Sequence, residues 1–458
     1  MGKYKKILFI IFIILFGFQM FSCSNDEPTH ICEDNLTEWN WDKEYECETT
    51  GTKVRICTIC EKVIYSESVE IHHEIETVII DATCEEDGKI KEACKNCDYI
   101  VETSITATGH DFSKLVITSE AKKDGISRRN CVCEHCDKIL SREKFANNGF
   151  FAHGKLSVNG PDLVDKDGEK FQLYGLSTHG LQWYGRVVNL DNFKALQNNF
   201  GINVVRLAMY TDENGYCSGG EKQKENMLTL VERGIEAATK LGLYVIVDWH
   251  MVGAENPNDK NPRYYMSQAK EFFSYISEKY KDYDNILYEI MNEPNGSTTW
   301  SDCKYYAEQV IPCIRANTDA IILVGNPKWT ADLNSVMSNP LKGFENIMYT
   351  YHFYAADHPY NAQVPTAYKK GFPVFISEFG MMESSGDGAL DTKAGEFWIS
   401  KLDSMNISYV AWNISSSRGS ASIFKYGAAD YTDVSDSNLK EWGVYLKNWY
   451  REKSGLNG

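Results

Sequence analysis

Residues 286–295 read ILYEIMNEPN, an apolar run that ends in two polar residues and a proline. The first half has the composition of a buried strand, although Glu289 interrupts it. Pro294 has no backbone N–H and cannot continue a hydrogen-bond ladder, so we expect the strand to end before it. The sequence therefore places the carboxyl group of Glu293 where a buried strand meets solvent.

A second apolar run ends in an acid in the same way. Residues 373–380 read PVFISEFG, in which Glu378 follows a strand-like half. Hydrolysis of a glycoside with retention or inversion needs two carboxyl groups on opposite sides of the bond. Glu293 and Glu378 are therefore candidates for such a pair.

The chain from residue 150 onward alternates strand-like runs with amphipathic stretches. Helices are expected at 226–241 and 267–280, and an opening hairpin that turns at Asp167–Gly168 is expected to close the bottom. Eight strands separated by helices predict a parallel sheet closed into a (β/α)8 TIM barrel over residues 150–458. The expected strands are 171–175, 203–207, 243–249, 286–291, 320–325, 347–353, 373–377 and 408–412.

Catalytic groups of such a barrel gather at the carboxyl ends of its strands. Polar or aromatic side chains stand at every predicted strand end, which core packing does not require. A single histidine at a strand end is more often structural, and a carboxylate there can simply cap a neighbouring helix. Polar or aromatic residues at the ends of many strands together favour a functional site. The candidates are His179, Trp183, Tyr184, Arg206, Tyr210, His250, Asn292, Glu293, Trp329, His352, Tyr354, Glu378 and Trp412.

Several motifs within residues 150–453 resemble glycoside hydrolase family 5, specifically its bacterial cellulase branch. They are STHGLQWYG, VVRLAMYT, VDWH, YEIMNEPNG, YHFYA, SEFG and AWN. The resemblance implies a retaining endo-β-1,4-glucanase that cleaves β-glucan polysaccharide without a catalytic metal or organic cofactor. It also implies that Glu293 is the acid/base and Glu378 the nucleophile, with their carboxyl groups about 5 Å apart.

The neighbouring residue types suit these two roles. Glu378 has to stay ionised, and we expect Arg206 to pair with it and Tyr354 to donate a hydrogen bond to it. The carboxyl group of Glu293, next to Pro294 and partly shielded from water, is expected to have a raised pKa.

Other candidates are expected to hold the sugar chain. The amide of Asn292 is placed to bind a 2-hydroxyl, and His250 and His352 are expected to flank the cleaved sugar and tune the two acids. His179 is expected to bind a hydroxyl further out. The aromatic candidates for contact with glucose rings are Trp183, Tyr184, Tyr210, Trp329 and Trp412.

Two positions depart from the family pattern. Phe379 stands where relatives commonly have tryptophan, and we expect its ring to pack behind the nucleophile. Ser417 stands where relatives usually have a lysine, which puts one substrate contact in doubt. Mixed-linkage glucan, xyloglucan and mannan stay open as alternative polymers, and a non-catalytic carbohydrate-binding surface protein is the alternative of another class.

The first residues have the pattern of an export signal. Basic residues precede an apolar stretch at 7–18, which is shorter than the ~20 residues of a membrane span, so residues 1–22 are predicted to be a signal peptide. Cys23 after Ser22 is similar to a relaxed bacterial lipobox, which predicts acylation of Cys23; ordinary cleavage nearby is the alternative.

The predicted location follows from this signal. We expect an exported lipoprotein of the outer membrane or cell surface, otherwise a secreted protein, with residues 23–46 as a tether and membrane contact only through Cys23. The net charge of −17 argues against nucleic acid as a partner, whereas neutral polysaccharide raises no such objection. A monomer is expected.

Residues 47–145 contain an internal repeat with a period of 37. Each complete copy reads C-x9-C-x2-C-x12-H, and we expect its three cysteines and one histidine to form a tetrahedral zinc site. Disulfides are the alternative, because exported proteins reach oxidising compartments. Three cysteines per copy argue against them, because an odd number leaves one cysteine of each copy without a disulfide partner. The third copy is imperfect, and the units resemble Cys/His repeats appended to bacterial surface proteins. The expected ligands are Cys47, Cys57, Cys60 and His73, then Cys84, Cys94, Cys97 and His110.

Overall fold

The structure is a computed structural model that describes residues 30–42 and 46–457. The predicted signal peptide and Cys23 lie outside the described residues, as does part of the predicted tether. Two compact units make up the chain: one ends at Asp111 and also includes Glu134–Cys136, and the other comprises Phe112–Cys133 and Asp137–Gly458.

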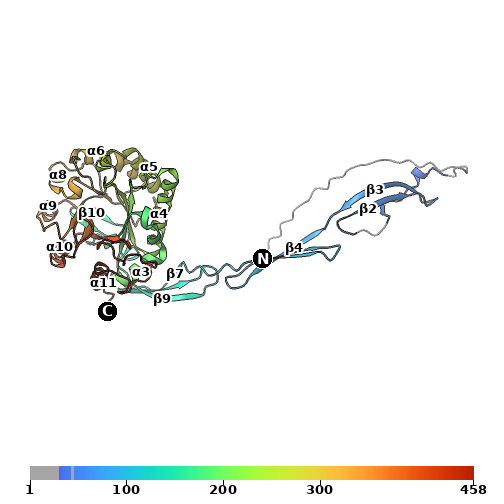
Figure 1. Ribbon diagram of the computed structural model, residues 1–458, viewed down its shortest axis with the longest axis horizontal. Helices are drawn as coiled ribbons and strands as arrows, with labels where there is room; N and C mark the ends of the chain where they lie inside the picture. The colour runs from blue at the N-terminus through green and yellow to red at the C-terminus, as the bar shows by residue number, and fades with distance from the viewer. Residues whose placement is uncertain (1–29, 43–45, 458) are drawn as a thin grey trace. The chain divides into compact units, whose positions relative to one another are not determined.

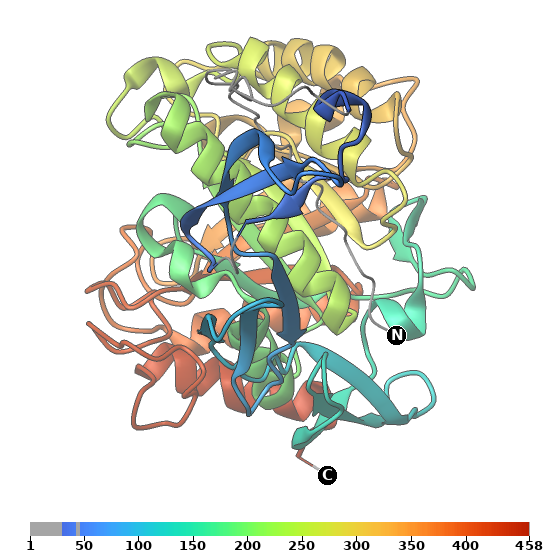
Figure 2. The same cartoon turned by 90° about the vertical axis from the view of Figure 1, so that its right-hand side faces the viewer.

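The second unit is built on a closed barrel of eight parallel strands, which confirms the predicted fold class. Helices surround this barrel (Figure 1), and Figure 2 shows them in a view turned by 90°. The strands are β12 (Tyr174–Thr178), β13 (Val204–Tyr210), β14 (Tyr244–His250), β15 (Ile286–Glu289), β16 (Ile322–Val324), β17 (Ile347–Tyr354), β18 (Val374–Gly380) and β19 (Tyr409–Ile414). The main helices are α3 (Leu190–Phe200), α4 (Gly220–Leu241), α5 (Met266–Lys279), α6 (Trp300–Arg315), α8 (Leu333–Ser338), α9 (Gln363–Lys369), α10 (Thr392–Ser404) and α11 (Glu441–Lys453).

Burial explains why these runs form this sheet. Every residue of the eight strands is buried, as expected for a parallel sheet with helices on one face and its own core on the other. β12 and β13 approach closely at Gly175, where a Cβ atom would lie 1.9 Å from the carbonyl oxygen of Val204. Within the described ranges, no helix has both the length and the apolar character that crossing a bilayer requires.

The element bounds differ from the predicted ones at two places that matter. β12 begins at Tyr174 rather than at residue 171, and Phe171 and Leu173, which precede it, pack in the cluster that fills the bottom of the barrel. β18 continues to Gly380, so Glu378 lies within the strand rather than after it. The chain therefore holds Glu378 on rigid, paired backbone.

The opening hairpin closes the bottom of the barrel, but its turn was predicted wrongly. Its strands are β10 (Ser157–Asn159) and β11 (Asp162–Val164), so the turn falls at Gly160–Pro161, where Gly160 has a φ of 60°. Asp167–Gly168 forms the next turn along the chain. Gly160 supplies the positive φ that a tight two-residue hairpin turn needs at its first central position.

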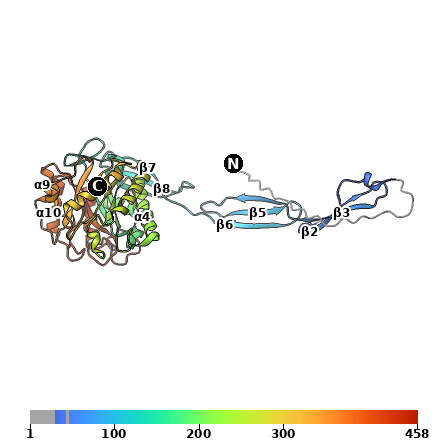
Figure 3. The ribbon, with the colours of Figure 1, turned by 90° about the horizontal axis from the view of Figure 1, so that it is seen from above.

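The repeats form small antiparallel sheets of three strands each, in the orders β1-β2-β3, β4-β5-β6 and β7-β8-β9. Figure 3 labels β5 and β6 as neighbours in the second sheet. The strands are β1 (Asn40–Trp41), β2 (Thr49–Ile56), β3 (Val63–Ile71), β4 (Ile75–Ile80), β5 (Gly88–Cys94), β6 (Ile100–Ile105), β7 (Lys114–Ser119), β8 (Ile126–Val132) and β9 (Ile139–Ala146).

The third sheet belongs to the same compact unit as the barrel. Arg129 on β8 is 2% exposed and donates hydrogen bonds to Gln197 and Asn198 of α3, both at 2.8 Å. It also donates to Glu143 Oε2 on β9 at 3.2 Å. The imperfect third copy is thus part of the barrel's own packing, although residues 47–145 were expected to form one separate region.

Candidate active site

The candidate site lies at the carboxyl ends of the barrel strands. Each of the sequence-predicted residues is found there or on the loop that follows: His179 after β12, Arg206 and Tyr210 on β13, His250 on β14, Asn292 and Glu293 after β15, Trp329 after β16, His352 and Tyr354 on β17, Glu378 on β18 and Trp412 on β19, with Trp183 and Tyr184 on the short helix α2 (Leu181–Tyr184).

Glu378 is held by two hydrogen-bond donors. Arg206 Nη1 donates to its Oε2 at 3.1 Å, and the Tyr354 hydroxyl donates to its Oε1 at 2.7 Å. Both contacts expected from the sequence are present. Two such donors fix the orientation of the carboxylate and suit a group that attacks as an anion.

Arg206 connects Glu378 to the other acids of the site. Its side chain is fully buried; Nε donates to Glu289 Oε2 at 2.7 Å and Nη2 donates to Asn292 Oδ1 at 2.7 Å. Nη2 also lies 3.0 Å from Asp248 Oδ2. The planar fork of one guanidinium therefore sets the positions of several neighbouring oxygen atoms.

Glu293 has the environment of a general acid. Only 15% of its side chain is exposed, and its Oε1 lies 2.8 Å from Nδ1 of His352. Burial raises the pKa of Glu293 to about 7, against the lowering effect of Arg206. Burial also lowers the pKa of His352 to about 4, so the imidazole is neutral at pH 7. A carboxyl group with this pKa holds a proton near neutrality and can give it up.

A chain of hydrogen bonds assigns the proton between Glu293 and His352. The Ser377 hydroxyl donates to Glu289 Oε1 at 2.6 Å, and its oxygen lies 2.8 Å from Nε2 of His352. Because a hydroxyl has one proton, Ser377 accepts from Nε2, and the neutral ring carries its proton there. Nδ1 is then an acceptor, so the proton in the contact with Glu293 belongs to the carboxyl group.

His250 is fixed from several directions. Its Nδ1 lies 2.6 Å from Asp248 Oδ2, and its Nε2 lies 3.3 Å from the amide nitrogen of Asn292. The ring stacks on Tyr210, with centroids 4.2 Å apart, and on Trp412 at 5.3 Å. Burial lowers the pKa of His250 well below its usual value. His250 is therefore a neutral ring with a fixed orientation on the surface of the site.

Further aromatic side chains continue this surface. The His179 ring contacts Trp183 at 5.4 Å, Tyr184 at 5.2 Å and Trp412 at 5.3 Å between centroids. Trp183 is 47% exposed, whereas Trp412 is 7% exposed and has His250 against one face. Trp183 thus offers a wide ring surface to solvent, and flat apolar faces of this kind suit sugar rings.

Trp329 occupies a strained turn beside the loop that carries Glu293. Lys328, Trp329 and Thr330 have φ values of 60°, 54° and 58°, a left-handed conformation that costs roughly 1–2 kcal/mol per residue. The Trp329 N–H donates to Pro294 O at 3.0 Å, and the Thr330 hydroxyl donates to Asn292 O. These hydrogen bonds hold the strained turn and keep Trp329, which is 56% exposed, next to the candidate acid.

Sequence reasoning missed Asp248, Glu289 and Ser377 as members of the site. All three are fully buried and connect Arg206 to the two histidines. The signal for Glu289 was present, because an acid inside an apolar strand needs a buried partner. Nothing in the local sequence marks Ser377, whose role depends on the strand that pairs beside it.

The two departures from the family pattern have structural counterparts. Phe379 is fully buried and stacks on Phe353 at 5.5 Å, as expected for a ring behind Glu378. The loop at Ser417 is tied down by Lys440, whose Nζ donates to the carbonyl oxygens of Ser417 at 2.8 Å and Arg418 at 2.9 Å. A lysine, Lys440, is thus present near Ser417, but its ammonium group is bound to the backbone of this loop.

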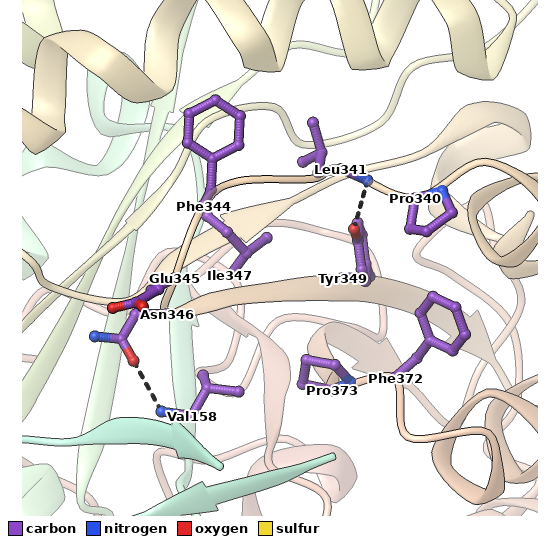
Figure 4. A pocket seen from close by; sticks show the side chains of 10 residues that line it. All are labelled: Val158, Pro340, Leu341, Phe344, Glu345, Asn346, Ile347, Tyr349, Phe372 and Pro373. Carbon is purple, nitrogen blue, oxygen red and sulfur yellow. Dashed lines mark hydrogen bonds between the residues drawn. The ribbon is translucent and has the colours of Figure 1, made fainter. Parts of the chain in front are cut away.

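A hollow at the other end of the barrel is unrelated to these groups (Figure 4). Its lining includes Ile347, the first residue of β17, and Pro373, which directly precedes β18. It therefore opens at the amino ends of the strands, where Val158 N donates to Asn346 Oδ1 at 3.0 Å. Residues at that end of a barrel stabilise the fold and do not meet the substrate.

Cysteines and histidines of the repeats gather in clusters that can hold a metal ion, but the expected grouping was wrong. One cluster contains His30, Cys32, Cys57 and Cys60, and another contains Cys47, His73, Cys94 and Cys97. Cys84 and His110 likewise lie with Cys136 and not with Cys94 and Cys97.

The antiparallel strands explain this correction. Cys47 precedes β2 and His73 follows β3, and these strand ends are paired at Thr49 and Ile71. The Cys57–Cys60 turn lies at the opposite end of β2, roughly 26 Å away for eight extended residues. The four residues of one copy therefore cannot converge on one ion.

Comparison with known proteins agrees with the barrel. The sequence profile of "Cellulase (glycosyl hydrolase family 5)" matches residues 164–418. Endoglucanase A of Butyrivibrio fibrisolvens is 44% identical over 299 residues, which cover 64% of this chain and 68% of the relative. An endoglucanase of Clostridium saccharobutylicum is 40% identical over 298 residues, 64% of each chain. The match thus spans about two thirds of these relatives.

Solved structures show the same architecture. The cellulase Cel5C_n has a TM-score of 0.63 at 35% identity, covering 67% of this chain and 95% of that one. The catalytic domain of Thermobifida fusca endoglucanase Cel5A has a TM-score of 0.61 at 35% identity, covering 66% and 99%, and a Glu-to-Gln variant of it was solved with cellotetraose. With the profile matched over more than half of its length, the chain belongs to glycoside hydrolase family 5.

Proposed function

We propose that this protein is a retaining endo-β-1,4-glucanase in which Glu378 is the nucleophile and Glu293 the acid/base. The observation that carries the proposal is the separation of the two acids: carboxylate oxygens of Glu293 and Glu378 lie within 4.8 Å of each other. Retaining enzymes have carboxyl groups about 5–5.5 Å apart, whereas inverting enzymes leave about 6.5–9.5 Å for a water molecule.

The proposed reaction has two displacements. Glu378 attacks the anomeric carbon while Glu293 gives its proton to the glycosidic oxygen, which releases the sugar on the leaving side and forms a glycosyl ester on Glu378. Glu293, now ionised, takes a proton from water, and the hydroxide attacks the anomeric carbon to free Glu378. Each carboxyl group ends the cycle as it began.

The environments of the two acids support these roles. Arg206 and Tyr354 bind both oxygens of Glu378, while burial raises the pKa of Glu293 to about 7 and its Oε1 lies 2.8 Å from His352 Nδ1. Two carboxyl groups held in such different environments within one site are the pattern expected for acid and nucleophile.

Cellulose-type β-1,4-glucan is the proposed substrate. Relatives over the barrel are endoglucanases, and the exposed rings of Trp183 and Trp329 provide stacking surface for neutral sugars. His179, Tyr184, Tyr210, His250, Asn292, His352 and Trp412 complete the proposed substrate contacts. Mixed-linkage glucan, xyloglucan and mannan are the alternative polymers, and the scheme uses no catalytic metal or organic cofactor.

Release of reducing sugar tests this function. We expect the purified protein to release sugar from carboxymethylcellulose and barley β-glucan more strongly than from xyloglucan and mannan, and Glu378→Ala to abolish the release. A folded protein that is silent on all four polymers would instead be a carbohydrate-binding surface protein. A dominant release from mannan or xyloglucan would keep the mechanism and change the substrate.

The location of the enzyme is also a proposal. The apolar stretch at 7–18 and the lipobox-like Ser22–Cys23 support export as a lipoprotein of the outer membrane or cell surface, anchored through Cys23. Secretion without an anchor is the alternative, and we propose a monomer. We assign residues 47–145 to the Cys/His repeats appended to bacterial surface proteins, with structural zinc in their clusters.

A further inference from the structure

The first two Cys/His clusters have the composition of structural zinc sites. His30, Cys32, Cys57 and Cys60 supply three sulfurs and one imidazole, and so do Cys47, His73, Cys94 and Cys97. Three thiolates and one histidine nitrogen form a closed tetrahedral set that leaves zinc no open position. Neither cluster belongs to the candidate active site.

Most ligand distances within the two clusters fit one ion at the centre of each, although His30 Nε2 lies only 3.0 Å from Cys57 Sγ. Zn–S bonds of about 2.3 Å and Zn–N bonds of about 2.0 Å place tetrahedral ligands roughly 3.5–3.8 Å apart. The sulfurs of Cys32 and Cys60 are 3.7 Å apart and those of Cys47 and Cys94 are 3.5 Å apart. Cys97 Sγ lies 3.4 Å from His73 Nδ1.

The surroundings orient the ligands of the second cluster. The His73 ring stacks on Tyr99 with centroids 4.0 Å apart, which fixes the direction of Nδ1. The backbone N–H of Asn96 points at Cys94 Sγ at 3.4 Å, a contact that stabilises a thiolate. A C-x2-C turn whose backbone closes from Cys94 N to Tyr99 O at 2.9 Å presents the two sulfurs on one side.

The sheets need such a link because they bury little apolar surface. All six residues of β4, IETVII, are exposed, and five of the six residues of β6 are exposed as well. Val78 and Ile79 are 52% and 59% exposed. Small units without a core usually depend on metal or disulfide staples for their stability.

We propose that each zinc ion joins consecutive repeats: the first cysteine and the histidine of one copy bind the ion together with the C-x2-C pair of the next copy. Cys47 and His73 flank the β2–β3 hairpin, Cys94 is the last residue of β5 and Cys97 follows it, so this ion links the first sheet to the second. His30 and Cys32, which precede the periodic units, supply the missing half-site for Cys57 and Cys60. Instead of zinc sites inside single copies, the ions form a staggered series in which the first ion binds residues before the repeats together with the first copy, and the next ion is shared by the first and second copies.

Zinc counting in paired variants separates the staggered series from sites within each copy. The full chain carries Cys47→Ser with His73→Ala, or Cys94→Ser with Cys97→Ser, or all four changes, and zinc is measured by mass spectrometry after gel filtration. The staggered series predicts that each pair loses one zinc and that the four changes together also lose one. Sites within single copies predict two lost ions for the combined variant, which would overturn the proposal.

Two controls make the count decisive. Cys303→Ser with Cys313→Ser, both on helix α6 of the barrel, has to leave the zinc content unchanged. In the wild-type chain, the thiols of the repeats also have to react with a thiol reagent once the protein is denatured and its zinc is chelated. A wild-type chain without zinc, whose repeat thiols stay unreactive until a reductant is added, contains disulfides instead and refutes the proposal. Activity on soluble substrate is not the readout, because the catalytic groups lie in the other unit.

Discussion

Replacing Ser377 by alanine tests the proton assignment between His352 and Glu293. The Ser377 hydroxyl accepts from Nε2 of His352 and donates to Glu289, which locks the ring in the tautomer whose Nδ1 accepts from Glu293. Without the hydroxyl, the proton of the neutral ring is free to move to Nδ1. Nδ1–H then donates to the ionised carboxylate of Glu293 and stabilises it, so the pKa of Glu293 falls.

The size of the effect follows from the hydrogen bond that is lost. A net hydrogen bond contributes about 0.5–1.5 kcal/mol, and one pKa unit corresponds to about 1.4 kcal/mol. Burial raises the pKa of Glu293 to about 7 in the wild type, so the alkaline limb of kcat/KM in Ser377→Ala is expected roughly 0.5–1 pH unit lower. The variant also leaves Glu289 Oε1 short of a donor, which is expected to lower stability by about 1–3 kcal/mol.

The assay is the pH profile of kcat/KM on an aryl cellobioside, read beside the melting temperature. Ser408→Ala is the matched control, because Ser408 is a buried serine directly before β19 that accepts from Leu173 N at 2.9 Å and lies at the other end of the barrel. Ser408→Ala is expected to lose stability and to keep the alkaline limb of kcat/KM at the wild-type pH. Ser377→Thr is expected to keep the alkaline limb at that pH as well. An unshifted limb in Ser377→Ala with a lowered melting temperature would refute the tautomer argument.

In the wild type, kcat/KM is expected to fall about tenfold per pH unit above about pH 7, because only protonated Glu293 can donate; a flat profile to pH 9 would contradict this. Glu293→Ala is expected to lose roughly 10²–10⁴-fold on cellobiosides with poor leaving groups and far less on a dinitrophenyl cellobioside, whose departure needs no proton, and equal losses on both would exclude Glu293 as the acid. Deleting residues 24–111 is expected to leave turnover of soluble substrate and the melting temperature nearly unchanged, whereas deleting 24–145 removes Arg129 from α3 and is expected to lower the melting temperature, so equal melting temperatures would show that the third sheet is dispensable.

The barrel was predictable because its rules are local and repeated. Each apolar run that ended in a polar or aromatic residue became a strand, and the closure of eight such strands is the known outcome of this alternation. The two errors have different causes. Phe171 packs in the cluster at the bottom of the barrel, which depends on residues far along the chain. Gly160–Pro161 is a local turn signal, but hydrophobic periodicity does not register it.

The candidate acids were also predictable, but the network that supports them was not. Glu293 and Glu378 stand in motifs, whereas Asp248, Glu289 and Ser377 matter only because β14, β15 and β18 bring them to Arg206 and His352. Pairing across strands cannot be read from spacing along one strand.

The repeats show the same limit more sharply. A period of 37 shows which residues of the copies are equivalent, but it does not show which of them bind the same ion. Ligands from one copy and ligands shared between neighbouring copies would both repeat every 37 residues. The direction of the strands decides which ligands meet. In an antiparallel hairpin, residues before the first strand and after the second lie together, while the turn between the strands lies a strand length away. A C-x2-C turn therefore faces the open end of a neighbouring hairpin, and the ligands of one ion come from two copies. The same reasoning requires a half-site before the first turn, and His30 and Cys32 supply it.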